Sequence, residues 1–475
     1  MVTINDFKRA YSKAIQDGYA AIFAGAGLSM SCGFVDWKGL LCDLAKEIKL
    51  DVEKEHDLVE VAQYYCNEKR GRNEISQKIL NYFVTETESE SKENENVRLL
   101  AELPIKTFWT TNYDHLIENT LKKSGKLVDI KMTTQSLATT LSGSDAIVYK
   151  MHGDYLNASE CVIIKDDYEC YNDTRQLFST TLQGDLVSKT FLFIGLSFED
   201  PNLNYILSRI RVLLDKNRRT HYLFSKRINK NDYEKINDYV YAQNKQELKM
   251  HDLLRYGIET VLIDDYSEIP EILSDLKIMN KCNNIFISGS AHKYGVKWKK
   301  TAPLFIRELV HALYKKDYKI ITGHARGIGS YVISSVLEEC QSSVIELEKH
   351  LMIKAFPYED KSRSDYDKII EEYRKGIFKS AGIAIFMFGN KTINNNTVLA
   401  DGVYKEYQIA KQSGAYIIPI GSTGYMAKQI WSEVYSDINN YPYLKKHISV
   451  LQECTEPHTV IDSIISILEE IRSTF

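Results

Sequence analysis

The sequence predicts an α/β protein that consists of two Rossmann-like domains, each built on a mostly parallel sheet. Apolar runs of strand length alternate with helical segments along most of the chain, which is typical of a parallel sheet covered on both faces. The alternation restarts between residues 265 and 284. The chain has 475 residues, too many for one typical domain of roughly 150 residues. We therefore place a boundary near residue 280, between domains 1–280 and 281–475.

The first domain begins with helices around a single strand. A short polar helix over residues 1–19 leads into a strand at Ala20–Ala24, and apolar residues at helical spacing predict a helix over Trp37–Leu50. Two further helices over Asp57–Tyr82 are separated near KRGR, and the acidic stretch 86–97 is expected to be solvated. Five later strands are expected at Thr107–Thr111, Ile147–Met151, Phe191–Gly195, His221–Phe224 and Glu259–Ile263.

The second domain repeats the alternation without repeating the sequence of the first. A helical or loop segment follows each of its expected strands. These strands are Asn284–Ser288, Lys319–Thr322, His350–Phe356, Gly382–Phe388 and Ala415–Ile420.

Composition excludes several classes of function. The net charge of −4 gives no basis for nucleic-acid binding, which needs a clustered positive surface. No apolar run reaches the roughly 18 residues of a membrane span, and the first residues lack a signal-peptide core, so we expect a cytoplasmic protein. None of the eight cysteines forms a CxxC pair. We therefore expect reduced, mostly buried thiols and no metal.

A glycine turn follows the first strand. In GAGLSMSCGFVDWK, Gly25 and Gly27 let the backbone turn sharply and approach a phosphate without an intervening Cβ. A helix that starts near Leu28 would direct free N–H groups at that phosphate, and Ser29 adds a hydroxyl. Alone, this pattern is also compatible with an ordinary strand-to-helix turn.

Three further segments fall at the ends of successive strands, where ligands bind in open α/β sheets. They are TTNYDHLIE (110–118), KMHGDY (150–155) and FIGLSFEDPN (193–202). Together with the glycine turn, their order and content resemble the sirtuin family. GAGLSMSCGFVDWK is similar to its GAG-hydrophobic-S…G-[IV]-P-D-F-R pattern, TTNYD to TQN-[IV]-D, HG to its HG motif, and GLSFEDP to G-[TS]-S…P.

The resemblance implies roles for individual residues. Asn112 would face the reacting ribose and His152 would be the base. The NAD site would be lined by Gly25, Ala26, Gly27, Ser29, Asp36, Trp37, Asp114, Gly195 and Ser197. Cleavage of the nicotinamide–ribose bond builds oxocarbenium-like charge, as in glycoside cleavage. A neutral carboxamide can orient a water or the ribose there, and an imidazole can take a proton at neutral pH. By itself, His152 could equally be a surface or core histidine.

The sequence departs from the sirtuin deacylases in one important respect. Those enzymes carry two cysteine pairs after the HG segment, whereas here only Cys161 and Cys170 occur between Gly153 and Gly195. Without that zinc module the simpler acceptor is water, so we expect an NAD glycohydrolase with NAD as its substrate. Two alternatives stay open: a non-catalytic scaffold that binds ADP-ribose or another nucleotide, and an NAD-dependent protein deacylase.

The second domain contains a second candidate pocket. Gly289 and Ser290 follow its first strand, and Gly323 and Gly327 follow the next. Arg and Lys suit phosphates and Glu can bind ribose hydroxyls. Residues of these types on neighbouring segments are Arg374, Lys391 and Glu406. Turn glycines in a packed sheet and solvated surface charges are the simpler alternatives.

This second domain resembles the SLOG superfamily of Rossmann-like nucleotide sensors, on GNK (389–391) and GVYKEY (402–407). A sirtuin-like domain followed by such a sensor resembles the effectors of the Thoeris antiphage system. That resemblance implies activation by a cyclic ADP-ribose isomer from a partner TIR-domain protein, and a homo-oligomer, specifically a tetramer. From the net charge and the absence of a long apolar run, we expect no nucleic-acid or membrane partner.

Overall fold

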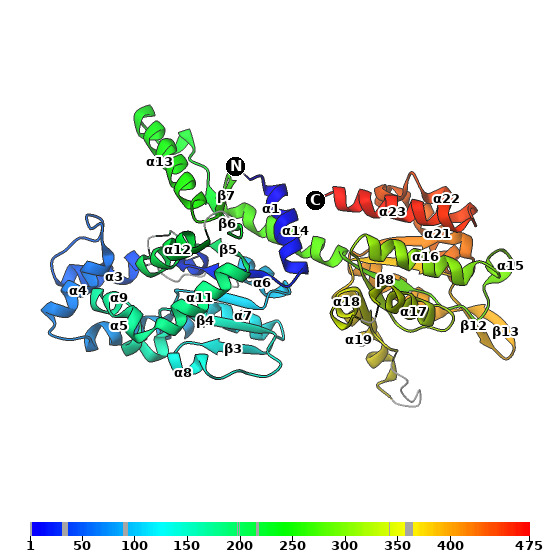
Figure 1. Ribbon diagram of the computed structural model, residues 1–475, viewed down its shortest axis with the longest axis horizontal. Helices are drawn as coiled ribbons and strands as arrows, with labels where there is room; N and C mark the ends of the chain where they lie inside the picture. The colour runs from blue at the N-terminus through cyan, green and yellow to red at the C-terminus, as the bar shows by residue number, and fades with distance from the viewer. Residues whose placement is uncertain are drawn as a thin grey trace. The chain divides into compact units, whose positions relative to one another are not determined.

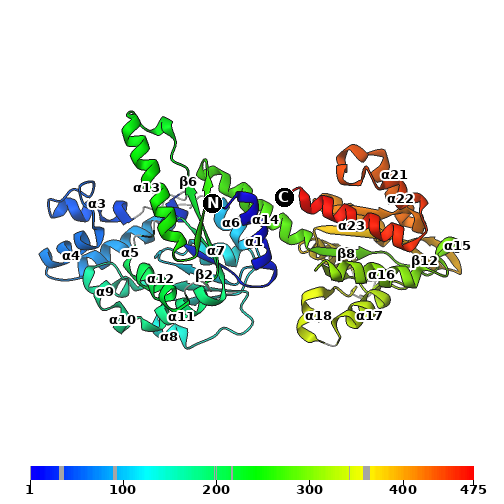
Figure 2. The ribbon, with the colours of Figure 1, turned by 45° about the horizontal axis from the view of Figure 1, so that its top comes forward.

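The computed structural model describes residues 2–30, 37–88, 94–196, 198, 200–214, 218–341, 343–356 and 364–475. The chain folds into two compact units, one that ends at Lys277 and one that begins at Ile278. Each unit contains its own parallel sheet with helices on both faces (Figures 1 and 2). The expected α/β class is thereby confirmed. In the described part of the chain, no helix has the length and apolar character that crossing a membrane requires.

The first unit is organised around a seven-stranded sheet. All of its strand pairs are parallel, in the order β3-β4-β2-β1-β5-β6-β7. The strands are β1 (Ala20–Ala24), β2 (Thr107–Thr110), β3 (Val128–Lys131), β4 (Ala146–Lys150), β5 (Thr190–Ile194), β6 (His221–Lys226) and β7 (Ile258–Ile263). The chain adds strands on one side of β1 and then crosses to the other, so the order reverses beside β1.

Helices cover both faces of this sheet because its central strands are apolar throughout. In β1, Ile22 and Ala24 belong to the core on one face, whereas Ala21 and Phe23 belong to the core on the other. The helices of this unit are α1 (Ile4–Gln16), α2 (Ala26–Ser29), α3 (Trp37–Glu47), α4 (Leu58–Glu68), α5 (Asn73–Glu88), α6 (Glu95–Glu102), α7 (Leu116–Lys123), α8 (Thr134–Leu137), α9 (Lys165–Glu169), α10 (Tyr171–Thr174), α11 (Gln176–Ser188), α12 (Pro201–Leu214) and α13 (Ile236–Leu254), with α14 (Ile269–Cys282) crossing the division. Helices α3, α4 and α5 form a separate apolar core with residues 155–164.

The second unit has a five-stranded parallel sheet in the order β10-β9-β8-β11-β14. Its strands are β8 (Asn284–Ser288), β9 (Lys319–Thr322), β10 (Leu351–Ile353), β11 (Ile383–Met387) and β14 (Tyr416–Ile420), and a hairpin pairs β12 (Asn390–Ile393) with β13 (Asn396–Leu399). The helices are α15 (Gly295–Trp298), α16 (Ala302–Lys315), α17 (Gly329–Cys340), α18 (Val344–His350), α19 (Tyr366–Phe378), α20 (Asp401–Gln412), α21 (Tyr425–Ser436), α22 (Ile448–Glu453) and α23 (Pro457–Ser473).

Every strand expected from the sequence is present, with ends that differ by three residues at most. The expectation missed β3 and the hairpin β12–β13. The helix expected after Gly27 is only a single turn, α2, within the described residues. Helix α13 has no buried residue and stands away from the sheet in both ribbon views (Figures 1 and 2).

Candidate functional site

The candidate site of the first unit lies at the carboxyl ends of four neighbouring strands. The registers of β4, β2, β1 and β5 align Lys150 with Thr110, Thr110 with Ala24, and Ala24 with Ile194. The loops that follow these aligned residues therefore begin at one edge of the sheet. This edge flanks β1, where the strand order reverses and where ligands bind in open α/β sheets.

Glycines bring two of these loops into backbone contact. Gly25 N donates to Ile194 O at 2.9 Å, and Gly27 N donates to Gly195 O at 3.0 Å. A Cβ on Gly25 or Gly195 would lie closer than 3.0 Å to the backbone of the facing loop, and Gly195 has φ +66°. The sequence therefore requires glycine here so that the loops after β1 and β5 can meet.

Asn112 is fixed by a buried hydrogen-bond relay. Its Nδ2 donates to Gly25 O at 3.1 Å and to Ser29 Oγ at 3.0 Å, and Ser29 Oγ donates to Asp114 Oδ2 at 2.9 Å. Because the carbonyl of Gly25 can only accept, the amide nitrogen must face it. The other oxygen of Asp114 accepts from Leu116 N at 2.9 Å at the start of α7. Four predicted site residues thus form one connected group.

A buried lysine supports the segment that carries Asn112. Lys150 Nζ donates to Tyr113 O at 3.1 Å and also to Asp114 O. It lies 3.0 Å from Glu118 Oε1 and 2.8 Å from Asp154 Oδ2, and it is fully buried. Burial alone would lower the pKa of Lys150, but the carboxylates around it outweigh burial and raise that pKa. The lysine is therefore held as a cation beneath the site.

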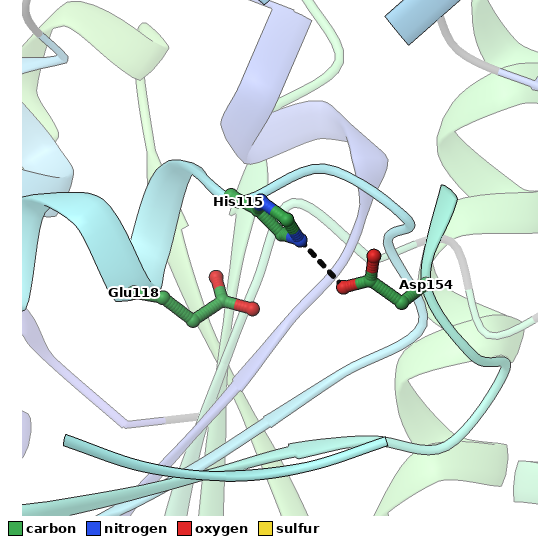
Figure 3. A group of neighbouring side chains, drawn as sticks. All are labelled: His115, Glu118 and Asp154. Atoms are coloured by element: carbon green, nitrogen blue, oxygen red, sulfur yellow. Dashed lines mark hydrogen bonds and ion pairs between the residues drawn. The ribbon is translucent and has the colours of Figure 1, made fainter. Parts of the chain in front are cut away.

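His115, Glu118 and Asp154 have ligand atoms within 4.8 Å of one another (Figure 3). They form the one group of metal-ligand type found among the described residues. His115 Nε2 lies 2.7 Å from Asp154 Oδ2. Burial opposes ionisation of Asp154, yet the hydrogen bonds from His115 and Lys150 lower its pKa to about 2. Because Lys150 already compensates both carboxylates, this group is a lysine-centred ion cluster.

His152 follows β4, and its side chain is buried against the segment that follows β5. It is 2% exposed, and its Nε2 lies 3.1 Å from Asp200 Oδ2. Neither ring nitrogen forms a hydrogen bond with any described residue. The pKa of Asp200 is lowered: burial acts in the opposite direction, but the charge of His152 and backbone hydrogen bonds outweigh it.

The remaining predicted residues of this site are less directly connected. Ala26 lies in α2 between the two glycines. Trp37 begins α3 and packs against the core of α3, α4 and α5. Asp36 and Ser197 lie outside the described residues.

In the second unit, glycines again allow close approach between loops. Gly289 follows β8, and a Cβ there would overlap Met387 O of β11. Gly327 has φ +74°, and a Cβ there would overlap Ala291 O. Ser290 Oγ donates to Asn390 O at 3.0 Å, which joins the loop after β8 to the hairpin.

Two of the predicted charges of the second unit lie near one another. Ser288 Oγ donates to Glu406 Oε2 at 2.6 Å, and burial raises the pKa of Glu406 although Ser288 and the charge of Arg374 oppose this shift. Arg374 is 7% exposed, and its Nε has no hydrogen-bond partner among the described residues. Lys391 instead pairs with Asp401 at the start of α20.

Gly323 lies beside the segment that carries Arg374. A Cβ on Gly323 would lie 3.2 Å from the hydroxyl of Tyr373, which itself donates to Lys354 O. The Arg374 guanidinium lies 5.8 Å from the ring centroid of Phe356. Gly323 therefore lies next to Tyr373, the residue that precedes Arg374, whereas Gly289 and Gly327 hold the loops after β8 and β9 close to neighbouring backbone.

Sequence reasoning missed several residues of these two groups. In the first unit they are Lys150 and Asp200, and in the second they are Ser288, Phe356 and Tyr373. Lys150 had a detectable signal, because a lysine that ends an apolar strand beside an HG motif must find buried carboxylates. Asp200 had the signal of an Asp-Pro pair that opens a helix.

Comparison with known proteins matches both units. A family model described as a SIR2-like domain matches residues 106–248, and one described as the Sir2- and TIR-associating SLOG family matches residues 268–471. Several curated relatives carry the name NAD(+) hydrolase ThsA. The protein from Cytobacillus dafuensis is 43% identical over 98% of this chain and 96% of its own length. The protein from Bacillus cereus (strain MSX-D12) is 44% identical over 92% and 90%, and that from Acinetobacter baumannii (strain 532279) is 40% identical over 97% of each.

Proposed function

Because the chain belongs to the ThsA family of NAD(+) hydrolases, we propose that its first unit hydrolyses NAD to nicotinamide and ADP-ribose. We further propose that it does so as an effector of bacterial antiphage defence of the Thoeris type, in the cytoplasm. The observation that carries the proposal is the fixed amide of Asn112 on the same strand-end edge as the buried imidazole of His152, whose Nε2 lies 3.1 Å from the Asp200 carboxylate.

Asn112 has the chemistry to act on the ribose. Both of its side-chain hydrogen bonds within the described residues come from Nδ2, which leaves Oδ1 to accept from a ribose hydroxyl or an attacking water. The amide adds no charge of its own beside the developing oxocarbenium ion. Ser29 and Asp114 hold it in place before substrate arrives, so little reorganisation is needed during the reaction.

His152 would act as the base. It takes a proton from the attacking water or from a ribose hydroxyl, and such proton transfer contributes about 10²–10⁴-fold to a rate. The diphosphate of NAD would lie against the loops that Gly25, Gly27 and Gly195 hold together, at the edge of the sheet where the strand order reverses. Trp37 and the undescribed Asp36 and Ser197 are assigned to the NAD site on the sirtuin resemblance alone.

A protein deacylase is the second candidate, and the cysteines argue against it. Among the described residues, no three groups of metal-ligand type that include a cysteine come together. Cys161 is buried and faces the carbonyl of Asp154 at 3.2 Å, whereas Cys170 is exposed. We therefore expect no stoichiometric zinc, a point that elemental analysis of the purified protein would decide.

We propose that the second unit binds a cyclic ADP-ribose isomer made by a partner TIR-domain protein. Arg374 supports this because its buried guanidinium keeps an unsatisfied donor that a diphosphate oxygen could accept. Glu406, beside Ser288, could accept a ribose hydroxyl. Lys391 could bind a phosphate of the signal only after its ion pair with Asp401 is broken.

The signal can activate the protein only if it binds the active state more tightly than the resting state. A shift from about 1:99 to 99:1 needs roughly 5.5 kcal/mol of preference. One small pocket would struggle to supply this amount, whereas identical pockets in a symmetric assembly add their preferences. We therefore propose a homo-oligomer, a tetramer, as the working form.

A turnover experiment separates the candidate functions. Nicotinamide release from NAD is measured with and without cyclic ADP-ribose isomers, and with and without an acyl-lysine peptide. An NAD hydrolase releases nicotinamide without the peptide when the signal is present. A deacylase requires the peptide, and a non-catalytic ADP-ribose scaffold releases none under any condition.

A further inference from the structure

His152 and Asp200 meet although their parent strands are not neighbours. β4 and β5 are separated in the sheet by β2 and β1. At about 4.8 Å between neighbouring strands, their ends lie roughly 14 Å apart. The 3.1 Å approach between His152 Nε2 and Asp200 Oδ2 therefore depends on the two loops reaching toward one another. The two strands between them, β2 and β1, are the strands that lead to Asn112 and Gly25.

The carboxylate of Asp200 is held in one orientation. Its Oδ1 accepts from Leu203 N at 2.8 Å, and this bond caps the start of α12. Its Oδ2 is the oxygen that faces His152. The two oxygens therefore have separate partners, and the cap fixes the second oxygen toward the imidazole.

The imidazole itself is confined by aromatic rings. Tyr168 of α9 and Tyr171 of α10 lie edge-on to it, with ring centroids 5.6 and 6.3 Å away. Tyr171 is anchored by its hydroxyl, which donates to Met151 O at 3.0 Å. These contacts limit rotation of the ring, so Nε2 stays on the side of Asp200 and Nδ1 on the opposite side.

We propose that Asp200 is the positioning residue of His152: it accepts the proton on Nε2 and thereby leaves Nδ1 as the nitrogen that acts as base. This inference rests on the proposed hydrolysis of NAD. In the resting geometry the pair is not yet aligned as a hydrogen bond, and such bonds commonly tighten when substrate is bound.

The proton balance follows from this tautomer. Nδ1 takes the proton of the attacking water or ribose hydroxyl, while Nε2 keeps its proton directed at Asp200. The resulting imidazolium is stabilised by the Asp200 carboxylate, which is not itself protonated. Water supplies the hydroxyl of ADP-ribose, nicotinamide leaves with its bonding electron pair, and His152 returns the proton to solvent.

Two substitutions of Asp200 distinguish positioning from a purely structural role. Both Asn and Ser cap helices well, so Asp200→Asn and Asp200→Ser should keep the start of α12. The Asn amide can present Nδ2 to Nε2 and force the ring proton onto Nδ1, which blocks the base. Ser merely removes the carboxylate. We expect kcat for NAD to fall about 10²–10⁴-fold in Asp200→Asn, less in Asp200→Ser, and KM to change little in either.

A purely structural role predicts the opposite order, because Asn is nearly isosteric with Asp. Equal or milder loss in Asp200→Asn than in Asp200→Ser, with both proteins folded by thermal melting, overturns the inference. Asp57→Asn is the matched control, since Asp57 caps α4 through Val59 N at 2.9 Å and should leave kcat unchanged. Wild-type protein that releases no nicotinamide in the presence of signal would instead refute the proposed function. Should both Asp200 variants fail to fold, the tautomer of His152 read by ¹⁵N NMR on the wild-type protein decides: a proton on Nδ1 overturns the inference.

Discussion

The two units use the same backbone device and surround it with different side chains. In each, a glycine that follows the first strand of the sheet lets the backbone after one strand touch that of a neighbouring strand: Gly25 with Gly195 in the first unit, and Gly289 with Met387 in the second. In the first unit the amide nitrogen of Asn112 already donates two hydrogen bonds before any ligand arrives. In the second, the Nε of Arg374 has no hydrogen-bond partner within the part of the chain that the structure describes.

This difference agrees with the functions proposed for the two units, turnover in the first and sensing of a signal in the second. A reacting site gains from groups that are already oriented, because no reorganisation then accompanies the reaction. A sensing site gains from a charge that is poorly compensated until the ligand binds, since the ligand then adds the most free energy. His152 fits the same pattern if Asp200 orients its Nε2, because the other ring nitrogen is then the one that acts as base.

Removal of a reacting group should have the largest effect. We expect His152→Ala to lower the rate of NAD cleavage about 10²–10⁴-fold or more, and Asn112→Ala to abolish detectable cleavage. Nicotinamide release at saturating signal is the measurement, with thermal melting as the check on folding. Near-wild-type turnover by a folded His152→Ala protein would remove the base from the mechanism.

Removal of the charge proposed to bind the signal should shift the response to much higher signal concentrations and spare the reacting site. A hydrogen bond to a charged group contributes about 1.5–3 kcal/mol, so Arg374→Ala should bind the signal roughly 10- to 150-fold more weakly. Calorimetric binding is measured beside nicotinamide release at several ligand concentrations. Arg307→Ala is the control, because Arg307 forms an exposed ion pair with Glu338 and should not alter the response. Normal binding and response in Arg374→Ala would show that the pocket lies elsewhere.

Addition of a single methyl group tests the shared backbone device. Gly195→Ala and Gly327→Ala would each place a Cβ against facing backbone at positive φ. Both substitutions should lower the melting temperature. The loss in free energy of unfolding should exceed the roughly 1–2 kcal/mol that an alanine in the left-handed region costs alone.

Two other glycines supply that reference. Gly125 and Gly414 have φ +83° and +71°, and a Cβ at either would meet nothing within 4 Å. Gly125→Ala and Gly414→Ala should therefore show the conformational cost without the clash. If the matched pairs melt at the same temperature, the loops do not need the close approach described here.

The smallest expected effect concerns Glu406 and has a defined sign. Burial raises the pKa of this carboxyl in the folded protein. Its contribution to the free energy of unfolding is therefore fully present below the ordinary pKa of about 4.3, and it is lost as pH rises through the raised pKa. Glu406→Gln removes this loss and can still accept from Ser288. We expect the ligand-free variant to melt above wild type at pH 7, with a difference that shrinks toward pH 4.5. A difference independent of pH would contradict this account.

The fold was largely predictable because its central strands are continuous apolar runs. β3 was missed because its sequence, VDIK, alternates, and its Asp129 and Lys131 form a 2.9 Å ion pair that removes the apolar signal. The hairpin β12–β13 is polar as well. Its turn residues Asn394 and Asn395 both have positive φ, so an Asn-Asn pair was the available signal.

The sequence placed several residues of the candidate site at strand ends, but it could not predict how they pair. Motif order placed Asn112, Ser29 and Asp114 at strand ends, but the amide–hydroxyl–carboxylate relay depends on three-dimensional register. The approach of Asp200 to His152 depends on strand order, since two strands lie between their parent strands. Spacing along a sequence carries no such information.

The ion cluster around Lys150 restricts how this sequence can evolve. Loss of the lysine alone would strand Glu118 and Asp154 as buried like charges, and loss of one carboxylate would leave the lysine with a single fixed counter-charge. A protein with any one of the three residues replaced would therefore be less stable, whereas one with all three replaced by apolar residues would not leave a buried charge unpaired. Among related chains these three positions should therefore covary as a set, and an alignment should detect them as epistatically linked.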